Sequence, residues 1–320
     1  MAMKQDSRIA ELPSAARQLG YALEESPDLD GAFERLYAGA DARARETYQA
    51  LEHLVRPDGV RPPERNAPFA PVRWALGLAP APGRAAAPVF QEYRRQESFG
   101  AGGATLIFSD FAGFLSYLAI VLGILLVVSS LYAVVILPQF RSLYDGFGAE
   151  LPGLTRLVFG GGSLFVILVV ACLVLIVLMG AFVHSVRRGL RHYVPAARWL
   201  EPLPLLGSVV RSYHQYLWTA RACLLLATGL PPADALRLAA PAAPADADTA
   251  LARDLGTASR LDRLEPELKF QHEAASEAFI RALARCRRRT RIVLTILTYT
   301  LAAIFVAAMY QPIFALGSNI

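Results

Sequence analysis

The pair His272-Glu273 is the place where the sequence comes nearest to a catalytic metal motif. In a zinc-protease helix, His-Glu-x-x-His supplies two metal ligands four residues apart and a glutamate that acts as general base. Position 276 is serine, so the second ligand is missing. The five histidines share no metal-ligand spacing: His53, His184, His192, His214 and His272. We therefore assign His272 to a surface helix and expect no metal site.

A second candidate is Gly160-Gly161-Gly162-Ser163, because glycine-rich loops can bind phosphate groups. No Gly-Lys-Ser/Thr follows it and no strand is predicted before it, so we interpret it as the start of an apolar helix or a site of close helix packing. The three cysteines form no C-x-x-C pair and are interpreted as small apolar residues. Without a nucleophile, a base or a metal set, we expect a protein that is not an enzyme and has no cofactor.

Basic residues gather in front of the last apolar stretch. The net charge of the chain is +5, which in a soluble protein would suggest nucleic acid. Six arginines and no acid occupy this approach: Arg281, Arg285, Arg287, Arg288, Arg289 and Arg291. Membrane proteins place arginine at the cytoplasmic ends of their spans, so we expect no nucleic-acid partner and interpret the cluster as a topology determinant that meets anionic lipid headgroups. Alternatively it is a protein-partner site, with Arg285, Arg287 and Arg288 as candidate contacts.

Three long runs contain no Asp, Glu, Lys or Arg: Phe111–Leu137, Leu157–Val186 and Ile292–Ile320. A helix of about 20 apolar residues crosses the hydrocarbon core of a bilayer, and a charge at its centre costs roughly 2.5–3.5 kcal/mol. No alternating strand pattern of any length is present. The sequence therefore predicts an all-α integral membrane protein with three transmembrane helices, at residues 111–137, 157–184 and 292–314.

The arginines also predict the orientation of the spans. The segment 185–291 has arginines at both ends and is expected to be a cytoplasmic helical-bundle domain, which makes the N-terminus cytoplasmic too. The gap 138–156 and the C-terminal residues 315–320 are then expected on the outer, periplasmic side. The first residues lack the apolar stretch of a cleavable signal peptide, so the first span is expected to direct insertion.

The cytoplasmic parts are predicted to be helical. We expect helices at 208–228, ending at Gly229, and at 233–240, a loop at 241–248, and one long helix that runs from about Leu261 into the third span. Residues 1–55 are predicted to be a helical segment broken at Ser26-Pro27. Residues 56–110, rich in Pro, Ala and Gly, are predicted to be a linker.

Four residues of the N-terminal segment recur later in the chain at a constant offset. Ala16, Arg17, Pro27 and Asp30 match Ala220, Arg221, Pro231 and Asp234, and both stretches are predicted to be helix, proline break, helix. Two interpretations stay open. The N-terminal segment is either a reduced first copy of the cytoplasmic domain or a chance match in an alanine-rich chain.

In the outer gap, Pro138 is expected to end the first span, because proline breaks a helix interior. Phe140, Leu143, Tyr144 and Phe147 fall on one face of a short amphipathic helix, which we expect at the membrane interface. Gly148 fits a helix C-terminal cap, and Leu151-Pro152 then leads the chain to the second span.

These residues resemble the outer-loop signature of the type II secretion system F family, the inner-membrane platform proteins of type II secretion and type IV pilus machines. The residues that carry it are Leu137-Pro138-Gln139-Phe140, Leu143-Tyr144, Phe147 to Pro152 and Thr155-Arg156. The C-terminal stretch Tyr310 to Gly317 is similar to the family's ending, and Arg221, Thr228 to Pro231 and Asp234 to Leu236 resemble its cytoplasmic helix pair.

The resemblance implies a non-enzymatic platform protein of a bacterial inner membrane. Such a protein couples a cytoplasmic assembly ATPase to the extrusion of pilin or pseudopilin helices and to protein secretion, beside other inner-membrane subunits and a second copy of itself. The implied outer-loop motif residues are Pro138, Phe140, Tyr144, Phe147, Leu151 and Pro152. The implied partner contacts, together with the arginines above, are Arg221, Asp234 and Asp262.

The chain departs from the family pattern in its cytoplasmic part. The family's Gly-Glu-x-x-Gly-x-Leu element has Gly256 to Asp262 as its nearest counterpart, which lacks the Glu and the second Gly, so we expect a divergent member. The alternative function is a membrane subunit of a transporter or export permease. Transporters usually place ionisable groups inside their spans, and here the runs hold only His184, at the cytoplasmic end of the second one.

Overall fold

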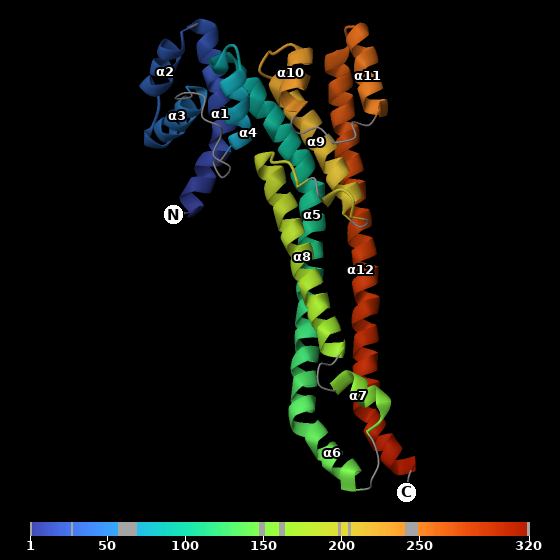
Figure 1. Ribbon diagram of the computed structural model, residues 1–320. Coiled ribbons are helices and arrows are strands. Elements are labelled where there is room, and N and C mark those ends of the chain that lie inside the picture. Colours follow the sequence, from blue (N-terminus) through green and yellow to red (C-terminus); the bar gives the residue numbers. More distant parts are fainter. Residues whose placement is uncertain are drawn as a thin grey trace. The chain divides into compact units, whose positions relative to one another are not determined.

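The computed structural model describes residues 2–26, 28–56, 69–146, 151–159, 164–197, 200–203, 206–240 and 249–318. These residues form helices and no strand (Figure 1), which confirms the all-α prediction. The chain divides into two compact units. The first joins Met1–Thr105 to Val186–Leu283, and the second joins Leu106–Ser185 to Ala284–Ile320.

The first unit begins with three short helices: α1 (Ala2–Glu25), α2 (Leu29–Ala38) and α3 (Ala42–Val55). Aspartates cap the N-termini of the second and third helices, because a carboxylate can accept hydrogen bonds from the free N–H groups of a first helical turn. Asp28 accepts from the amide of Gly31 at 3.3 Å, and Asp41 accepts from Ala44 at 2.7 Å. The helical prediction for residues 1–55 is confirmed for the part of this segment that the structure describes.

The linker prediction for residues 56–110 is wrong wherever the structure describes them. Residues 57–68 lie outside the described ranges, and the rest forms α4 (Ala70–Leu78) and the start of α5 (Pro82–Leu131). Proline is tolerated in a first helical turn, and alanine is the best helix former. The same composition therefore suits a helix start as well as a linker. Burial decides between them, since Val72, Leu76 and Val89 have no exposed surface.

The remaining helices of the first unit follow the second apolar run: α9 (Gly207–Leu226), α10 (Pro232–Ala239), α11 (Thr249–Arg260) and the first half of α12 (Leu264–Ser318). Gly229 has φ = 84° in the turn after α9, which confirms the predicted helix end. The long last helix begins three residues later than expected. Asp262, with φ = 54°, lies in the turn that precedes it. Residues 241–248, predicted to be a loop, lie outside the described residues.

A separate helical domain at 185–291 is not confirmed, because its helices share a core with the N-terminal segment. The side-chain amide of Gln96 on α5 donates to the carbonyl of Ala220 on α9 at 3.2 Å, and Tyr193 donates to Gln96. The guanidinium of Arg221 lies 5.6 Å from the centre of the Trp74 ring on α4. Segments far apart in sequence thus form one folded unit.

Among the residues that the structure describes, three helices are long and apolar enough to cross a membrane: Leu106–Gly146, Phe165–Leu190 and Leu264–Ala315. The third has 52 residues, which at about 1.5 Å per residue is more than twice the thickness of a bilayer core. Its uncharged part begins at Ile292, so the bilayer-crossing stretch is the second half. Large apolar side chains on all three helices are more than half exposed: Ile120, Val127, Val134, Ile167, Val177 and Ile296. Contact with lipid accounts for such surfaces.

The helix ends differ from the predicted spans at two places. Pro138 does not end the first span, because α5 continues through a π-helical segment, η1 (Tyr132–Ile136), into α6 (Leu137–Gly146). Pro138 is the second residue of α6, directly after the π-helical segment, and the helix continues past it. Residues 157–159, predicted to begin the second span, belong to α7 (Gly153–Phe159), and α8 (Leu164–His192) begins later. Gly160 to Ser163, which separate the two helices in sequence, lie outside the described residues, so the interpretation given to them above stays a prediction.

Candidate functional site around Pro312

Pro312 lies inside α12, in the stretch that resembles the family's C-terminal ending. Proline has no backbone N–H, so the carbonyl four residues earlier, that of Ala308, loses its helical donor. The hydroxyl of Thr155 on α7 donates to this carbonyl at 2.9 Å. Thr155 and Ala308 have no exposed surface. A side chain from another helix therefore supplies the hydrogen bond that the proline removes.

Two tyrosines donate to the same turn of α12. Tyr132, the first residue of η1, donates to the carbonyl of Met309 at 3.1 Å. Tyr144 on α6 donates to the carbonyl of Pro312 itself at 2.8 Å. Figure 1 shows α6 and α7 beside the last turns of α12. Hydroxyls from three neighbouring segments thus meet three carbonyls of one helix, and we call Tyr132, Tyr144 and Thr155 the hydroxyl cluster.

Aromatic packing supports the hydroxyl cluster. The ring of Tyr132 lies 4.5 Å from that of Phe159, which in turn lies 5.8 Å from Phe305 on α12. Phe165, near the start of α8, stacks on Phe305 at 6.0 Å. Each of these four rings is at most 6% exposed. Such pairs add roughly 0.5–1.5 kcal/mol beyond their buried area, so aromatic side chains join α7, α8 and α12 at this level.

The first span contains a π-helical segment that begins at Tyr132 of the hydroxyl cluster. The amide of Leu137 bonds to the carbonyl of Tyr132, one residue further back than in an α-helix. Tyr132 is buried, whereas Val134 is 74% exposed. A π-helical turn shifts the side chains relative to the regular helical period, and such turns occur frequently at functional sites.

The structure divides the predicted outer-loop motif into buried and exposed residues. Tyr144 is buried against α12, Phe140, Leu151 and Pro152 are half-buried, and Pro138 is exposed. Phe147 lies outside the described residues. The roles of Tyr132 and Thr155 were not predicted from the sequence. A proline within an otherwise uncharged, helix-predicted run was the available signal, because it leaves a carbonyl that needs another donor.

Arg221, predicted to contact a partner, is engaged inside the first unit. Its guanidinium donates to the carbonyl of Tyr193 and faces the Trp74 ring. Burial lowers the pKa of Arg221 from its usual value. A cation held in this way stabilises the fold, and its geometry does not support a partner contact.

The other predicted contacts lie at the surface. Asp234 pairs with Arg237 at 3.2 Å in the first turns of α10, and Asp262 is exposed before α12. Arg285 and Arg288 are exposed on α12. Arg287 pairs with Asp110 at 3.0 Å. These side chains remain accessible to a partner.

The surface assignment of His272 is wrong, since the side chain is only 7% exposed. Its Nδ1 lies 3.2 Å from the hydroxyl of Thr219, and its ring lies 5.4 Å from that of Tyr216. Burial, together with the charge of Arg95, lowers the pKa of His272 to about 4. His272 is therefore a neutral core residue near pH 7. Within the described ranges, no three His, Cys, Asp or Glu residues are grouped so as to hold a metal ion.

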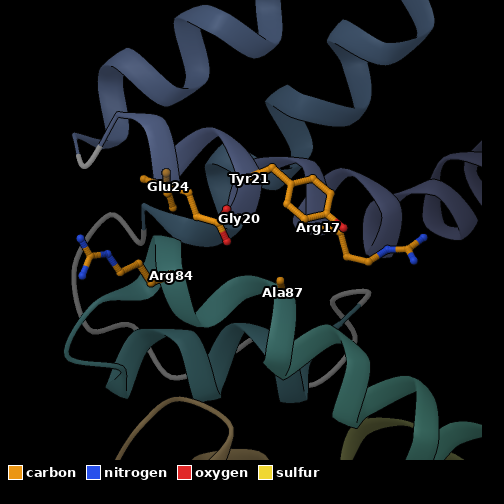
Figure 2. Close-up of a pocket in the computed structure, with 7 residues that line it drawn as sticks. Arg17, Gly20, Tyr21, Glu24, Arg84 and Ala87 are labelled. Atoms are coloured by element: carbon orange, nitrogen blue, oxygen red, sulfur yellow. The ribbon is translucent and has the colours of Figure 1, made fainter.

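The first unit has a hollow of about 560 Å³ between α1 and α5, shown in Figure 2. Gly20 and Ala87 line its middle, where a methyl group added at Gly20 would lie 3.7 Å from the Ala87 side chain. Arg17 and Tyr21 lie at one end, and Glu24 and Arg84 at the other (Figure 2). Cations lie at both ends and Tyr21 is 66% exposed, so this hollow selects no particular ligand.

No protein-family model, no curated protein and no solved structure matches the chain. The resemblance to the secretion family stays a prediction that rests on the residues named above.

Proposed function

We propose that the chain is a non-enzymatic platform protein of a type II secretion or type IV pilus-like machine in a bacterial inner membrane. In this role it couples a cytoplasmic assembly ATPase to the movement of pilin or pseudopilin helices out of the membrane. The three apolar helices support the membrane part of the proposal. The residues that resemble the F family support the rest.

One observation carries the proposal. Tyr144 and Thr155 come from the outer-loop signature, and Pro312 comes from the C-terminal signature, more than 150 residues away in sequence. Hydrogen bonds join the two signatures, because Tyr144 donates to Pro312 and Thr155 donates to the carbonyl that Pro312 leaves free. Two motifs that resemble one family thus belong to a single structural feature. Its effect is to hold the last helix against the other apolar segments, which suits a scaffold.

The proposed topology places the first unit in the cytoplasm, together with the N-terminus, and the C-terminus in the periplasm. The arginines before Ile292 and after the second run support this orientation. The first unit then meets the ATPase through side chains such as the partly exposed Asp234 and the exposed Asp262. A positively charged partner surface would complement these carboxylates.

The test is deletion of the gene in its host, followed by complementation with the full chain carrying an affinity tag. Secretion or pilus assembly is expected to stop and to return, and the tagged chain is expected to recover a hexameric secretion ATPase. Intact secretion and pili after deletion would disprove the proposal. Recovery of an ATP-binding cassette protein in place of a secretion ATPase would instead support a transporter subunit.

Charge-reversal variants sharpen this test. Asp234→Lys with Asp262→Lys is expected to lower recovery of the ATPase about tenfold, because each change replaces an attraction with a repulsion. Glu277→Lys, at another exposed acid of the first unit, is the matched control and is expected to keep wild-type recovery. If both variants lost ATPase recovery equally, Asp234 and Asp262 would not be part of the interface.

A further inference from the structure

A groove of about 410 Å³ lies where the charged part of α12 meets its apolar part. On α5 it is lined by Asp110, Phe114 and Tyr117, and on α12 by Arg287 and Arg291. The α5 residues are spaced at i, i+4 and i+7, and the arginines at i and i+4, so each set lies on one helix face. All five residues belong to the second unit.

The two arginines are held in place by α5. Arg287 is 35% exposed in its side chain and pairs with Asp110 at 3.0 Å. The guanidinium of Arg291 lies 5.3 Å from the centre of the Phe114 ring. Guanidinium groups fixed in this way lose little side-chain freedom on binding an anion, which favours recognition of phosphate.

The charge around the groove favours an anion. Two arginines outweigh one aspartate within it, and the exposed Arg288 and Arg289 follow on α12. No Asp or Glu occurs in α12 after Glu277. The field at this end of the apolar helices is therefore positive.

Apolar surface continues from the groove. Tyr117 is 59% exposed, and Ile120 and Ile124, on the next turns of α5, are 63% and 59% exposed. On α12, Ile292 and Ile296 are at least half exposed. Tyrosine is enriched at the level of lipid headgroups. A ligand that fits has a negative head beside the arginines and a long apolar tail beyond Tyr117, which describes a phospholipid and not free phosphate.

We propose that this groove is a binding site for one anionic phospholipid. The phosphodiester accepts hydrogen bonds from Arg291 and from Arg287. Arg287 then either binds Asp110 and the phosphate together or gives up its pair with Asp110. The acyl chains lie along the exposed isoleucines that follow Tyr117. The carboxylate of Asp110 competes with the phosphate for Arg287 and so limits the affinity.

The test uses the purified full chain in a neutral detergent, titrated with palmitoyl-oleoyl phosphatidylglycerol or with the matching phosphatidylcholine, and native mass spectrometry counts the bound lipids. Phosphatidylglycerol is expected to bind about tenfold more tightly. The double variant Arg287→Gln with Arg291→Gln is expected to weaken the binding of phosphatidylglycerol about 10- to 30-fold, because it removes the attraction of two arginines for an anionic headgroup. Binding of phosphatidylcholine is expected to stay unchanged.

Two further variants separate a built site from general attraction. Arg288→Gln with Arg289→Gln removes the same charge outside the groove and is expected to weaken phosphatidylglycerol binding less than about threefold at an ionic strength that screens distant charges. Asp110→Asn removes the competing carboxylate and is expected to strengthen the binding of phosphatidylglycerol about threefold or more. Equal losses in the two double variants, or no gain in Asp110→Asn, would overturn the proposal. Displacement of the lipid by equimolar inorganic phosphate would overturn it as well, since the acyl chains would then add nothing.

Discussion

The hydroxyl of Thr155 donates to the carbonyl of Ala308, the one carbonyl that Pro312 leaves without its helical donor. The two residues are 153 positions apart in sequence and fully buried. An interhelical hydrogen bond within a membrane contributes about 0.6 kcal/mol on average and about 1.7 kcal/mol at most. This bond should lie near the upper limit, because the acceptor has no alternative partner in its own helix.

Thr155→Val should therefore destabilise the second unit by about 1–2 kcal/mol, since it keeps the side-chain shape and removes the donor. Pro312→Ala restores an N–H for the Ala308 carbonyl, so the same Thr155→Val change should cost less than about 0.5 kcal/mol in that background. Unfolding in mixed detergent and dodecyl sulfate, followed by circular dichroism, measures all four proteins of the cycle. Thr300→Val, at an exposed threonine of α12, is the control. Additive effects in the cycle would contradict the assigned hydrogen bond.

Tyr144→Phe should destabilise the second unit by about 1 kcal/mol, because it removes only the hydroxyl that donates to Pro312. Tyr299→Phe makes the same chemical change at a tyrosine that is 66% exposed, and it should have almost no effect. The same detergent unfolding assay compares the two variants. Equal stability of both would mean that the Tyr144 hydroxyl adds nothing to the cluster.

Gly229 and Gly256 should respond in opposite directions to alanine. Gly229 has φ = 84°, where an L side chain costs roughly 1–2 kcal/mol, so Gly229→Ala should destabilise the first unit by that amount. Gly256 lies inside α11 with open space around it, so Gly256→Ala should stabilise by roughly 0.5–1 kcal/mol. Urea unfolding followed by tryptophan fluorescence reports on this unit, since Trp74, Trp199 and Trp218 all fall in its segments. A change of the same sign in both variants would refute the assigned backbone conformations.

His272 should make the first unit less stable in mild acid. Its pKa is lowered to about 4 in the fold, whereas an unfolded histidine titrates near 6.5, so the unfolded chain binds the proton more readily between these values. The stabilising contribution is complete above pH 6.5 and is lost as the pH falls toward 4. Relative to His272→Gln, the wild type should lose about 2–3 kcal/mol between pH 7.5 and 4.5. Urea unfolding at both pH values measures this, with His53→Gln at an exposed histidine as the control. A parallel pH dependence of the wild type and His272→Gln would show that His272 is not buried neutral.

The apolar helices could be predicted from the sequence, because a run without charge is a local property that a bilayer requires. The turn at Gly229 could also be predicted, since a glycine with two prolines shortly after it, at 231 and 232, stops a helix locally. The helices at residues 70–110 could not, because proline and alanine suit both a linker and a helix start. Only the burial of Val72 and Leu76 in the folded unit distinguishes these possibilities.

The hydroxyl cluster depends on contacts between distant segments. Tyr144 was predicted as part of the outer-loop motif, but its hydrogen-bond partner is a backbone carbonyl, which every residue carries and no motif marks. His272 was assigned to a surface helix because position 276 is serine and no second metal ligand follows it. One face of this helix packs on Thr219 and Tyr216, and a single sequence does not show which face is covered.

The hydroxyl cluster also has a consequence for biosynthesis. Its donors lie 153 to 177 residues before their acceptors, so they leave the ribosome long before those acceptors exist. At about 5–20 residues per second, Thr155 waits roughly 8–30 s for the carbonyl of Ala308. Throughout that interval the first apolar helix and α7 hold polar hydroxyls without these partners. A nascent chain released before residue 308 would keep these hydroxyls without their acceptors, so the hydroxyl cluster forms only after the last helix has been made.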